Sequence, residues 1–115
     1  MKYLCNVFTL SMLAHEDYFI RSRAVPQWQF VDSLNNINEF TSAVGHDATA
    51  AVLTERLQLD IQKNRIDVSL TPDDMLYVAE FKTPRLAEGE ILSAERTREL
   101  DIKYWIVTIQ RDLLG

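Results

Sequence analysis

The sequence has one cysteine, three glycines, three prolines and no apolar run near the roughly 20 residues that cross a bilayer. Because Cys5 has no second cysteine to pair with, an internal disulfide is excluded, which fits a reducing cytoplasm. The cysteine and histidines also lack the spacing of a zinc site, so we expect neither a bound metal nor a cofactor. The missing apolar run argues against association with a membrane.

Sequence signatures of several enzyme classes are missing too. There is no Walker-type glycine loop, no GxGxxG and no GxSxG, and the carboxylates lack metal-site spacing. The net charge of −5 argues against binding to duplex nucleic acid, which usually needs a basic face. A small anionic ligand is compatible with this charge, because a few arginines concentrated in a cleft decide its binding.

The length of 115 residues and the 47% hydrophobic content predict one globular domain over residues 1–115. Its first segment, residues 2–13, is almost continuously apolar and follows Met1. Asn6, Thr9 and Ser11 interrupt this segment, and no cleavage site follows it. We therefore interpret it as a buried first strand rather than a signal peptide.

Hydrophobic periodicity and the positions of proline and glycine predict the other elements. Asp47 suits the N-cap of the second helix, and Trp28 and Trp105 are expected in the core. The alternation in 64–70 predicts a strand that forms a hairpin with the next one. The predicted strands are 2–13, 18–25, 41–45, 64–70, 75–81 and 102–110; the helices are 31–40, 47–57 and 93–100; 71–74 is a turn and 82–90 a loop. This order predicts an α/β domain with a mixed sheet of about five strands flanked by helices.

His46 follows Gly45 at the predicted start of a helix, in the stretch "AVGHDATA". Unpaired backbone N–H groups at a helix start favour anions. A phosphate ester bound there would lie within proton-transfer range of the imidazole. The alternative interpretation is a histidine that hydrogen-bonds a loop carbonyl.

Other polar residues are candidates for the same site. Arg65 and Arg85 could bind phosphate through the planar fork of the guanidinium, and Glu88 could orient a protonated histidine. The alternative is that these side chains are simply solvated. Three polar residues of the first predicted strand, Asn6, Thr9 and Ser11, suggest a polar cavity, a subunit interface or a wetted sheet edge.

Five segments together resemble one family: "LCNVFTLSML", "SAVGHDATA", "QKNRIDVSL", "DDMLYVAEF" and "RLAEGEILS". This family is the small viral ring nucleases, which are anti-CRISPR proteins of archaeal viruses and phages with relatives in type III CRISPR loci. The resemblance runs in unbroken order over residues 2–109. The motifs "GHDAT", "QKNRI" and "RLAEG" are jointly specific at these separations.

The resemblance implies a homodimer that binds cyclic tetra-adenylate, the second messenger of type III CRISPR immunity, across the subunit interface. It further implies metal-independent cleavage to linear di-adenylate ending in a 2′,3′-cyclic phosphate, in the cytoplasm of the host cell if the protein is viral. His46 would be the catalytic acid, assisted by Glu88. The implied ligand-binding residues are Asn6, Thr9, Ser11, Thr49, Arg65 and Arg85.

The sequence departs from the family pattern at several positions. Thr9 replaces a serine, Ser11 an asparagine, Ala48 a serine and Glu80 a glutamine, while residues 24–40 resemble the family little. We expect these changes to alter affinity more than chemistry, because the hydroxyl at position 9 is retained.

Cleavage of the ring without a metal is chemically reasonable. The ribose 2′-hydroxyl already lies beside the phosphorus, so the protein need only align it and protonate the leaving 5′-oxygen. Two chains that each contribute Arg65 and Arg85 would match the four phosphates of the ring. Two alternatives remain: a protein that sequesters cyclic oligoadenylate without efficient cleavage, and a protein-interaction module.

Overall fold

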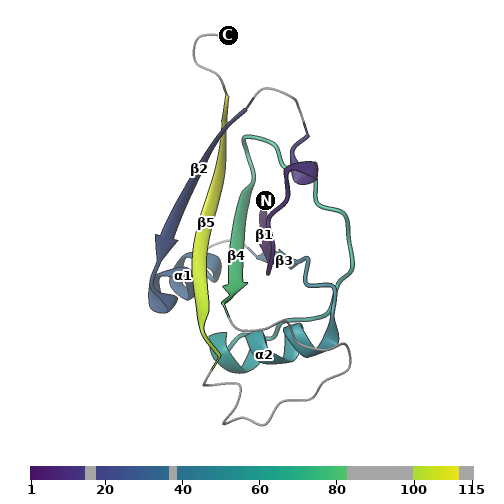
Figure 1. Cartoon of the computed structure of the whole chain (residues 1–115), viewed down its shortest axis with the longest axis vertical. Coiled ribbons are helices and arrows are strands. Elements are labelled where there is room, and N and C mark those ends of the chain that lie inside the picture. Colours follow the sequence, from purple (N-terminus) through teal and green to yellow (C-terminus); the bar gives the residue numbers. More distant parts are fainter. Residues whose placement is uncertain (15–17, 37–38, 83–99, 112–115) are drawn as a thin grey trace.

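Five strands form one mixed sheet in the computed structural model, which describes residues 1–14, 18–36, 39–82 and 100–111 (Figure 1). The strands are β1 (Lys2–Cys5), β2 (Tyr18–Val25), β3 (Phe40–Ser42), β4 (Met75–Phe81) and β5 (Ile102–Arg111). Their order across the sheet is β2-β5-β4-β1-β3. β1 is parallel to both β3 and β4, whereas β5 is antiparallel to β4 and β2. The predicted single α/β domain with a mixed five-stranded sheet is confirmed.

Two helices cover one face of this sheet, α1 (Gln27–Leu34) and α2 (Asp47–Leu57). Their buried residues pack with the strand residues that point to the same face; this core includes Leu4, Phe30, Leu34, Leu53, Leu57, Tyr77 and Tyr104. Irregular segments cover the other face, where the core includes Cys5, Val68, Leu70, Val78 and Val107. The two faces of the sheet therefore have different kinds of cover.

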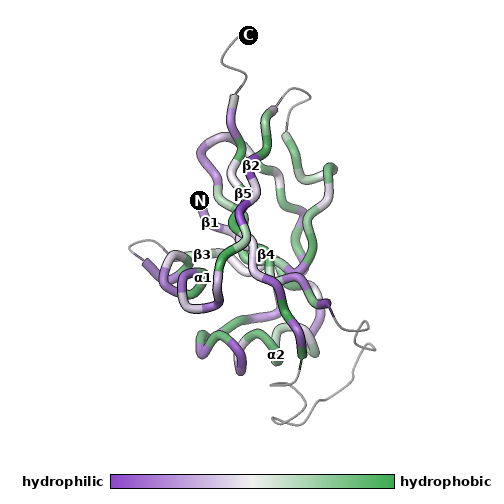
Figure 2. Tube along the Cα trace, turned by 60° about the vertical axis from the view of Figure 1, so that its left-hand side comes forward, coloured by the Kyte–Doolittle hydropathy of each residue, from purple (hydrophilic) through white to green (hydrophobic). Residues whose placement is uncertain are grey.

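Helix α2 has the bounds that the sequence predicts, and the expected stripe of Ala50, Leu53 and Leu57 is buried. Figure 2 shows hydrophobic and hydrophilic residues alternating along it. The helix ends where Gln58 adopts a left-handed conformation, with φ of 55°. The prediction of Asp47 as N-cap is wrong by one residue, because His46 occupies the N-cap and Asp47 is the first helical residue. An acidic residue there still compensates the helix dipole.

The first predicted strand is much shorter than residues 2–13. β1 ends at Cys5, and the chain turns back through a 3₁₀ helix at Leu10–Met12. Phe8 and Met12 instead pack against the face of the sheet that lacks helices. The apolar character of this segment thus reflects packing onto a sheet rather than pairing within it.

The predicted strand over 64–70 is also wrong. Only Leu70 makes a bridge, to Leu13, and although Val68 is buried, Ile66 is 41% exposed. β4 pairs with β1 and β5, so the predicted hairpin does not exist. The turn over 71–74 is confirmed, because the Asp74 carboxylate accepts hydrogen bonds from the Thr71 N–H and hydroxyl at 2.9 and 3.1 Å.

The remaining elements agree in part with the sequence. β2, β4 and β5 lie where they were predicted, and β2 is exposed along most of its length. α1 begins at Gln27, directly after Pro26, four residues before the predicted start at 31, and ends at Leu34. The predicted helix over 93–100 and most of the loop over 82–90 lie outside the described residues.

Candidate functional site

The candidate site lies where parallel strands end. β1, β3 and β4 run in one direction, so their carboxyl ends point to the same edge of the sheet. β1 lies between the other two strands, and the chain crosses from β3 through α2 to β4 on the far side of β1. Open α/β sheets bind ligands at such a reversal of strand order. Asn6 and His46 follow β1 and β3, respectively, at this edge.

His46 forms the N-cap of α2 through its backbone. Its carbonyl accepts a hydrogen bond from the Ala50 N–H at 3.0 Å, while φ of −132° and ψ of 139° keep the residue extended. The side chain does not cap the helix and has no hydrogen-bond partner among the residues that the structure describes. The half-buried imidazole is thus available for another partner at the positive end of the helix dipole.

Arg65 lies directly beside this turn. Its Nε and Nη2 both donate to the carbonyl oxygen of Gly45, at 3.3 and 3.2 Å. Gly45 directly precedes His46, so the Arg65 guanidinium is bound to the residue next to His46. The structure therefore brings together two residues that are 19 positions apart in the sequence.

Asn64 holds the segment that carries Arg65. Its N–H donates to the Val44 carbonyl and its side-chain Nδ2 to the Ser42 carbonyl, both at 2.7 Å. Ser42 in turn donates its hydroxyl to the Gln62 carbonyl at 2.6 Å. On the other side of Asn64 in the chain, Lys63 Nζ lies 3.6 Å from the Asp47 carboxylate. Residues 62–65 thus form a cationic border along the amino end of α2.

The other predicted ligand-binding residues differ in their settings. Thr49 is only 7% exposed in the first turn of α2, and its hydroxyl has no hydrogen-bond partner within the described part of the chain. Asn6 is half-buried just after β1. Thr9 and Ser11 are exposed and share a hydrogen bond of 2.8 Å, with no described hydrogen bond to His46 or Arg65.

Arg85 and Glu88 lie outside the described residues, which stop at Lys82 and resume at Leu100. The described part shows that β4 ends and β5 begins at the edge where the parallel strands end. The Lys82 N–H donates to the Asp101 carbonyl at 2.8 Å and so joins the two strands there.

Glu80 lies near the carboxyl end of β4. Its carboxylate accepts a hydrogen bond from Trp105 Nε1 at 3.2 Å and pairs with Lys82 Nζ at 3.2 Å. The Trp105 N–H and then Lys82 lower the pKa of Glu80. Lys103 Nζ lies 4.5 Å above the centre of the Trp105 ring. The Glu80 carboxylate is therefore held by two partners, one on β5 and one just after β4.

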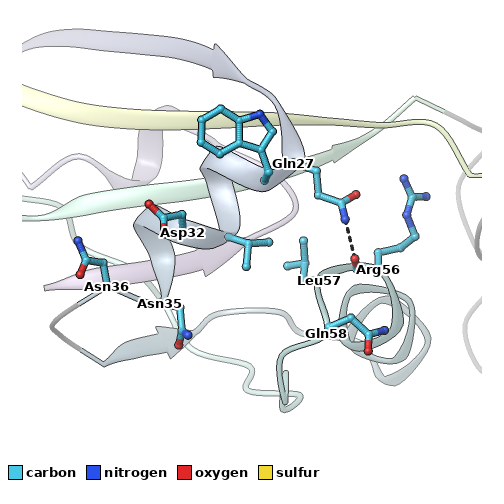
Figure 3. Close-up of a pocket in the computed structure, with 9 residues that line it drawn as sticks. Gln27, Asp32, Asn35, Asn36, Arg56, Leu57 and Gln58 are labelled. Atoms are coloured by element: carbon cyan, nitrogen blue, oxygen red, sulfur yellow. Dashed lines mark hydrogen bonds between the residues drawn. The ribbon is translucent and has the colours of Figure 1, made fainter.

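Two hollows of the described surface are not lined by His46 or Arg65. One, of about 740 Å³, separates α1 from the carboxyl end of α2 and is lined by Gln27, Trp28, Val31, Asp32, Asn35, Asn36, Arg56, Leu57 and Gln58 (Figure 3). Gln27 Nε2 bridges the two helices by donating to the Arg56 carbonyl at 2.8 Å. Trp28, expected in the core, is 71% exposed.

A second hollow, of about 510 Å³, borders β3 and the segment 62–64, and its lining includes Lys63 and Asn64. Neither hollow includes His46 or Arg65.

The described ranges contain no group of three or more His, Cys, Asp or Glu side chains placed to hold a metal ion. In the same ranges, no helix has both the length and the apolar character needed to traverse a lipid bilayer.

Residues 2–106 match the model of the STIV B116-like family. The chain belongs to the STIV B116-like family. Two relatives come from archaeal viruses. The first is uncharacterized protein 26 of Sulfolobus islandicus filamentous virus (isolate Iceland/Hveragerdi). It is 32% identical over 110 residues, which cover 95% of this chain and 92% of that protein. Uncharacterized protein ORF116 of Acidianus filamentous virus 1 (isolate United States/Yellowstone) is 30% identical over 98 residues, 85% and 83% of the two chains.

The fold of the family is known from a solved structure. B116 of Sulfolobus turreted icosahedral virus superposes on this chain with a TM-score of 0.80, covering 93% of this chain and 97% of that one at 24% identity. At this identity the likeness shows the fold alone. Together, the viral relatives of this STIV B116-like chain support a viral origin for it.

Lys63 and Asp47 were not among the predicted site residues of this STIV B116-like chain. The stretch "QKNR" could have indicated Lys63 as a site residue, because Lys63 and Arg65 flank one asparagine. Side chains two positions apart in an extended segment point the same way. The prediction of Asp47 as N-cap also hid its pairing with Lys63. An N-cap carboxylate would accept hydrogen bonds from the first turn of the helix instead.

Proposed function

We propose that this protein is a metal-independent ring nuclease that cleaves cyclic tetra-adenylate, the second messenger of type III CRISPR immunity, and so acts as an anti-CRISPR protein in the host cytoplasm. One observation carries the proposal: Arg65 donates two hydrogen bonds to the carbonyl of Gly45, the residue before His46 at the amino end of α2. A cation, a free imidazole and a helix amino end thus meet at the carboxyl edge of three parallel strands.

The arrangement suits cleavage by the substrate's own ribose. The 2′-oxygen attacks the adjacent phosphorus and forms the 2′,3′-cyclic phosphate, while the bond from phosphorus to the 5′-oxygen breaks. The 2′-hydroxyl proton passes to water, and the imidazolium of His46 donates a proton to the departing 5′-oxygen. Arg65 and the N–H groups of the first turn of α2 would hold the phosphate in line for this attack.

A site shared by two chains would match the charge of the ring. In a homodimer with a twofold axis, Arg65 and Arg85 of both chains would supply four positive charges for the four phosphates of the ring. Glu88 would assist His46 from the same segment as Arg85. The remaining ligand contacts would come from Asn6, Thr9, Ser11 and Thr49.

The direct test is incubation of labelled cyclic tetra-adenylate with the protein in EDTA. We expect linear di-adenylate with a cyclic phosphate end, because no step needs a metal. Retention of intact ring on the protein would instead indicate sequestration, and no binding at micromolar concentration would favour a protein-interaction module. The same digest with a six-nucleotide ring measures ring-size preference.

A further inference from the structure

Lys63 and Arg65 face the amino end of α2 from one anchored strip of chain. Asn64, between them, is fixed through its N–H and its side chain to the carbonyls of Val44 and Ser42. The Asn64 side chain bonds Ser42, whereas the two cationic side chains contact the residues at the start of α2. Arg65 reaches Gly45 and Lys63 reaches Asp47.

The ion pair between Lys63 and Asp47 is weak. The N···O distance to Asp47 is 3.6 Å, and the two side chains are 46% and 83% exposed. Exposed ion pairs of this kind contribute little to stability because water and salt screen them. The Asp47 carboxylate also lies at the first residue of α2, where the helix dipole attracts an anion. It therefore lies at the end of α2 that a bound phosphate would also favour.

Thr49 independently indicates a ligand in this turn. Its side chain is more than nine-tenths buried, yet its hydroxyl has no hydrogen-bond partner among the residues described. Buried polar groups are normally satisfied, so an unpaired one needs an explanation. A phosphate or ribose oxygen at the amino end of α2 would provide the missing partner.

We infer that Lys63 is a phosphate-binding residue of the proposed site and that Asp47 competes with the ligand for it. When a phosphate of the ring reaches the amino end of α2, the Lys63 ammonium exchanges the carboxylate for the phosphate. The chain's own anion thus sets the affinity for the ligand. This inference deepens the proposed ring-nuclease function and rests on it.

The test measures equilibrium binding of cyclic tetra-adenylate with fluorine in place of every 2′-hydroxyl, a ring that cannot attack its own phosphates. Lys63→Gln should weaken binding about tenfold and reduce the salt slope by about one for each lysine that contacts the ring. Asp47→Asn should tighten binding several-fold, because Lys63 is then free. Lys63→Arg keeps the charge and should retain most of the affinity.

Matched controls change the same charges at the opposite edge of the sheet. Arg21→Gln on β2 and Asp73→Asn before β4 are both exposed there and should leave affinity and salt slope unchanged. Equal losses in Lys63→Gln and Arg21→Gln would mean general attraction and would overturn the inference. So would unchanged binding by Lys63→Gln, or weaker binding by Asp47→Asn. Failure of the wild-type protein to bind the ring would contradict the proposed function itself.

Discussion

His46 is the residue on which the proposed chemistry depends most directly. Its imidazole is half-buried and has no hydrogen-bond partner among the described residues, while its backbone carbonyl accepts from Ala50. The backbone role would survive replacement of the side chain. A substitution here therefore separates catalysis from folding.

We predict that His46→Ala lowers single-turnover cleavage of cyclic tetra-adenylate by roughly 10²-fold or more, because the 5′-oxygen loses its proton donor. Binding of the ring should persist, since Arg65 and the helix amino end remain. Cleavage rates and gel-shift affinities of the two proteins check both statements. A variant that cleaves at the wild-type rate would remove His46 from the reaction.

Cys5 illustrates how burial changes the reactivity of a residue. It is 2% exposed, and burial raises the pKa of its thiol from 9.0 to about 11. At pH 8 the native protein should therefore react with iodoacetamide far more slowly than the same protein in concentrated urea, because the thiolate is the reactive form. Mass spectrometry of the alkylated chain measures both rates. Equal rates would show that the face of the sheet bearing Cys5 is open.

At the scale of elements, the segment 62–65 depends on one side-chain amide. Asn64→Ala removes the hydrogen bond to the Ser42 carbonyl, and we predict a loss of about 1 kcal/mol in unfolding free energy. Ring binding should weaken as well, since Lys63 and Arg65 lose their fixed position. Urea unfolding and a binding titration measure these effects.

Gln62→Ala is the matched control for Asn64→Ala. The Gln62 side chain lies in the same segment but bonds the exposed Asp60 carboxylate, and its backbone carbonyl still accepts from Ser42. Its replacement should leave stability and binding nearly unchanged. Equal losses in the two variants would show that Asn64 has no special anchoring role.

The pairing of β4 with β5 predicts a pH dependence. The Trp105 N–H and Lys82 lower the pKa of Glu80 in the folded state below its value of 4.5 in the unfolded chain. The stability gained from the ionised carboxylate is present above pH 4.5 and is lost as the pH falls through the folded-state pKa. Wild type should therefore unfold at a higher temperature than Glu80→Gln at pH 7, and this difference should shrink at pH 3. A constant difference in thermal midpoint would contradict this.

The sequence was sufficient for some elements and not for others. α2 and β2 have their predicted bounds because each has a clear period between clear breaks. The segments 2–13 and 64–70 bury apolar residues without pairing over most of their length, and periodicity detects burial, not hydrogen-bonding partners. α1 lies within residues 24–40, where the family resemblance is weakest.

The candidate site was partly predictable for a similar reason. Gly45, His46 and Arg65 belong to short motifs with a definite chemistry, and the structure bonds Arg65 to Gly45, the residue before His46. The pairing of Lys63 with Asp47 depends on how two distant segments pack, which no local pattern reveals. Thr49 was predicted only through the family resemblance, because a threonine in a helix gives no local signal of its own.

At the scale of the whole molecule, the proposed function places two chains around one ring. We predict that calorimetric titration gives one ring per two chains and that sedimentation shows a dimer in the presence of the ring. A site shared across a twofold axis requires this ratio. One ring per chain would mean that each chain binds its own ligand.

The unequal covering of the sheet has a consequence for the lifetime of the native state. Helices α1 and α2 shield one side, while in the described ranges the side of Cys5, Val68 and Leu70 is covered by coil, the short 3₁₀ helix Leu10–Met12 and one bridge. Backbone amides of that coil should exchange with deuterated water well before those of α2, because coil can lift away without breaking a ladder. Thermal unfolding and proteolysis should therefore begin in this coil, while the helices and the sheet stay folded together until global unfolding.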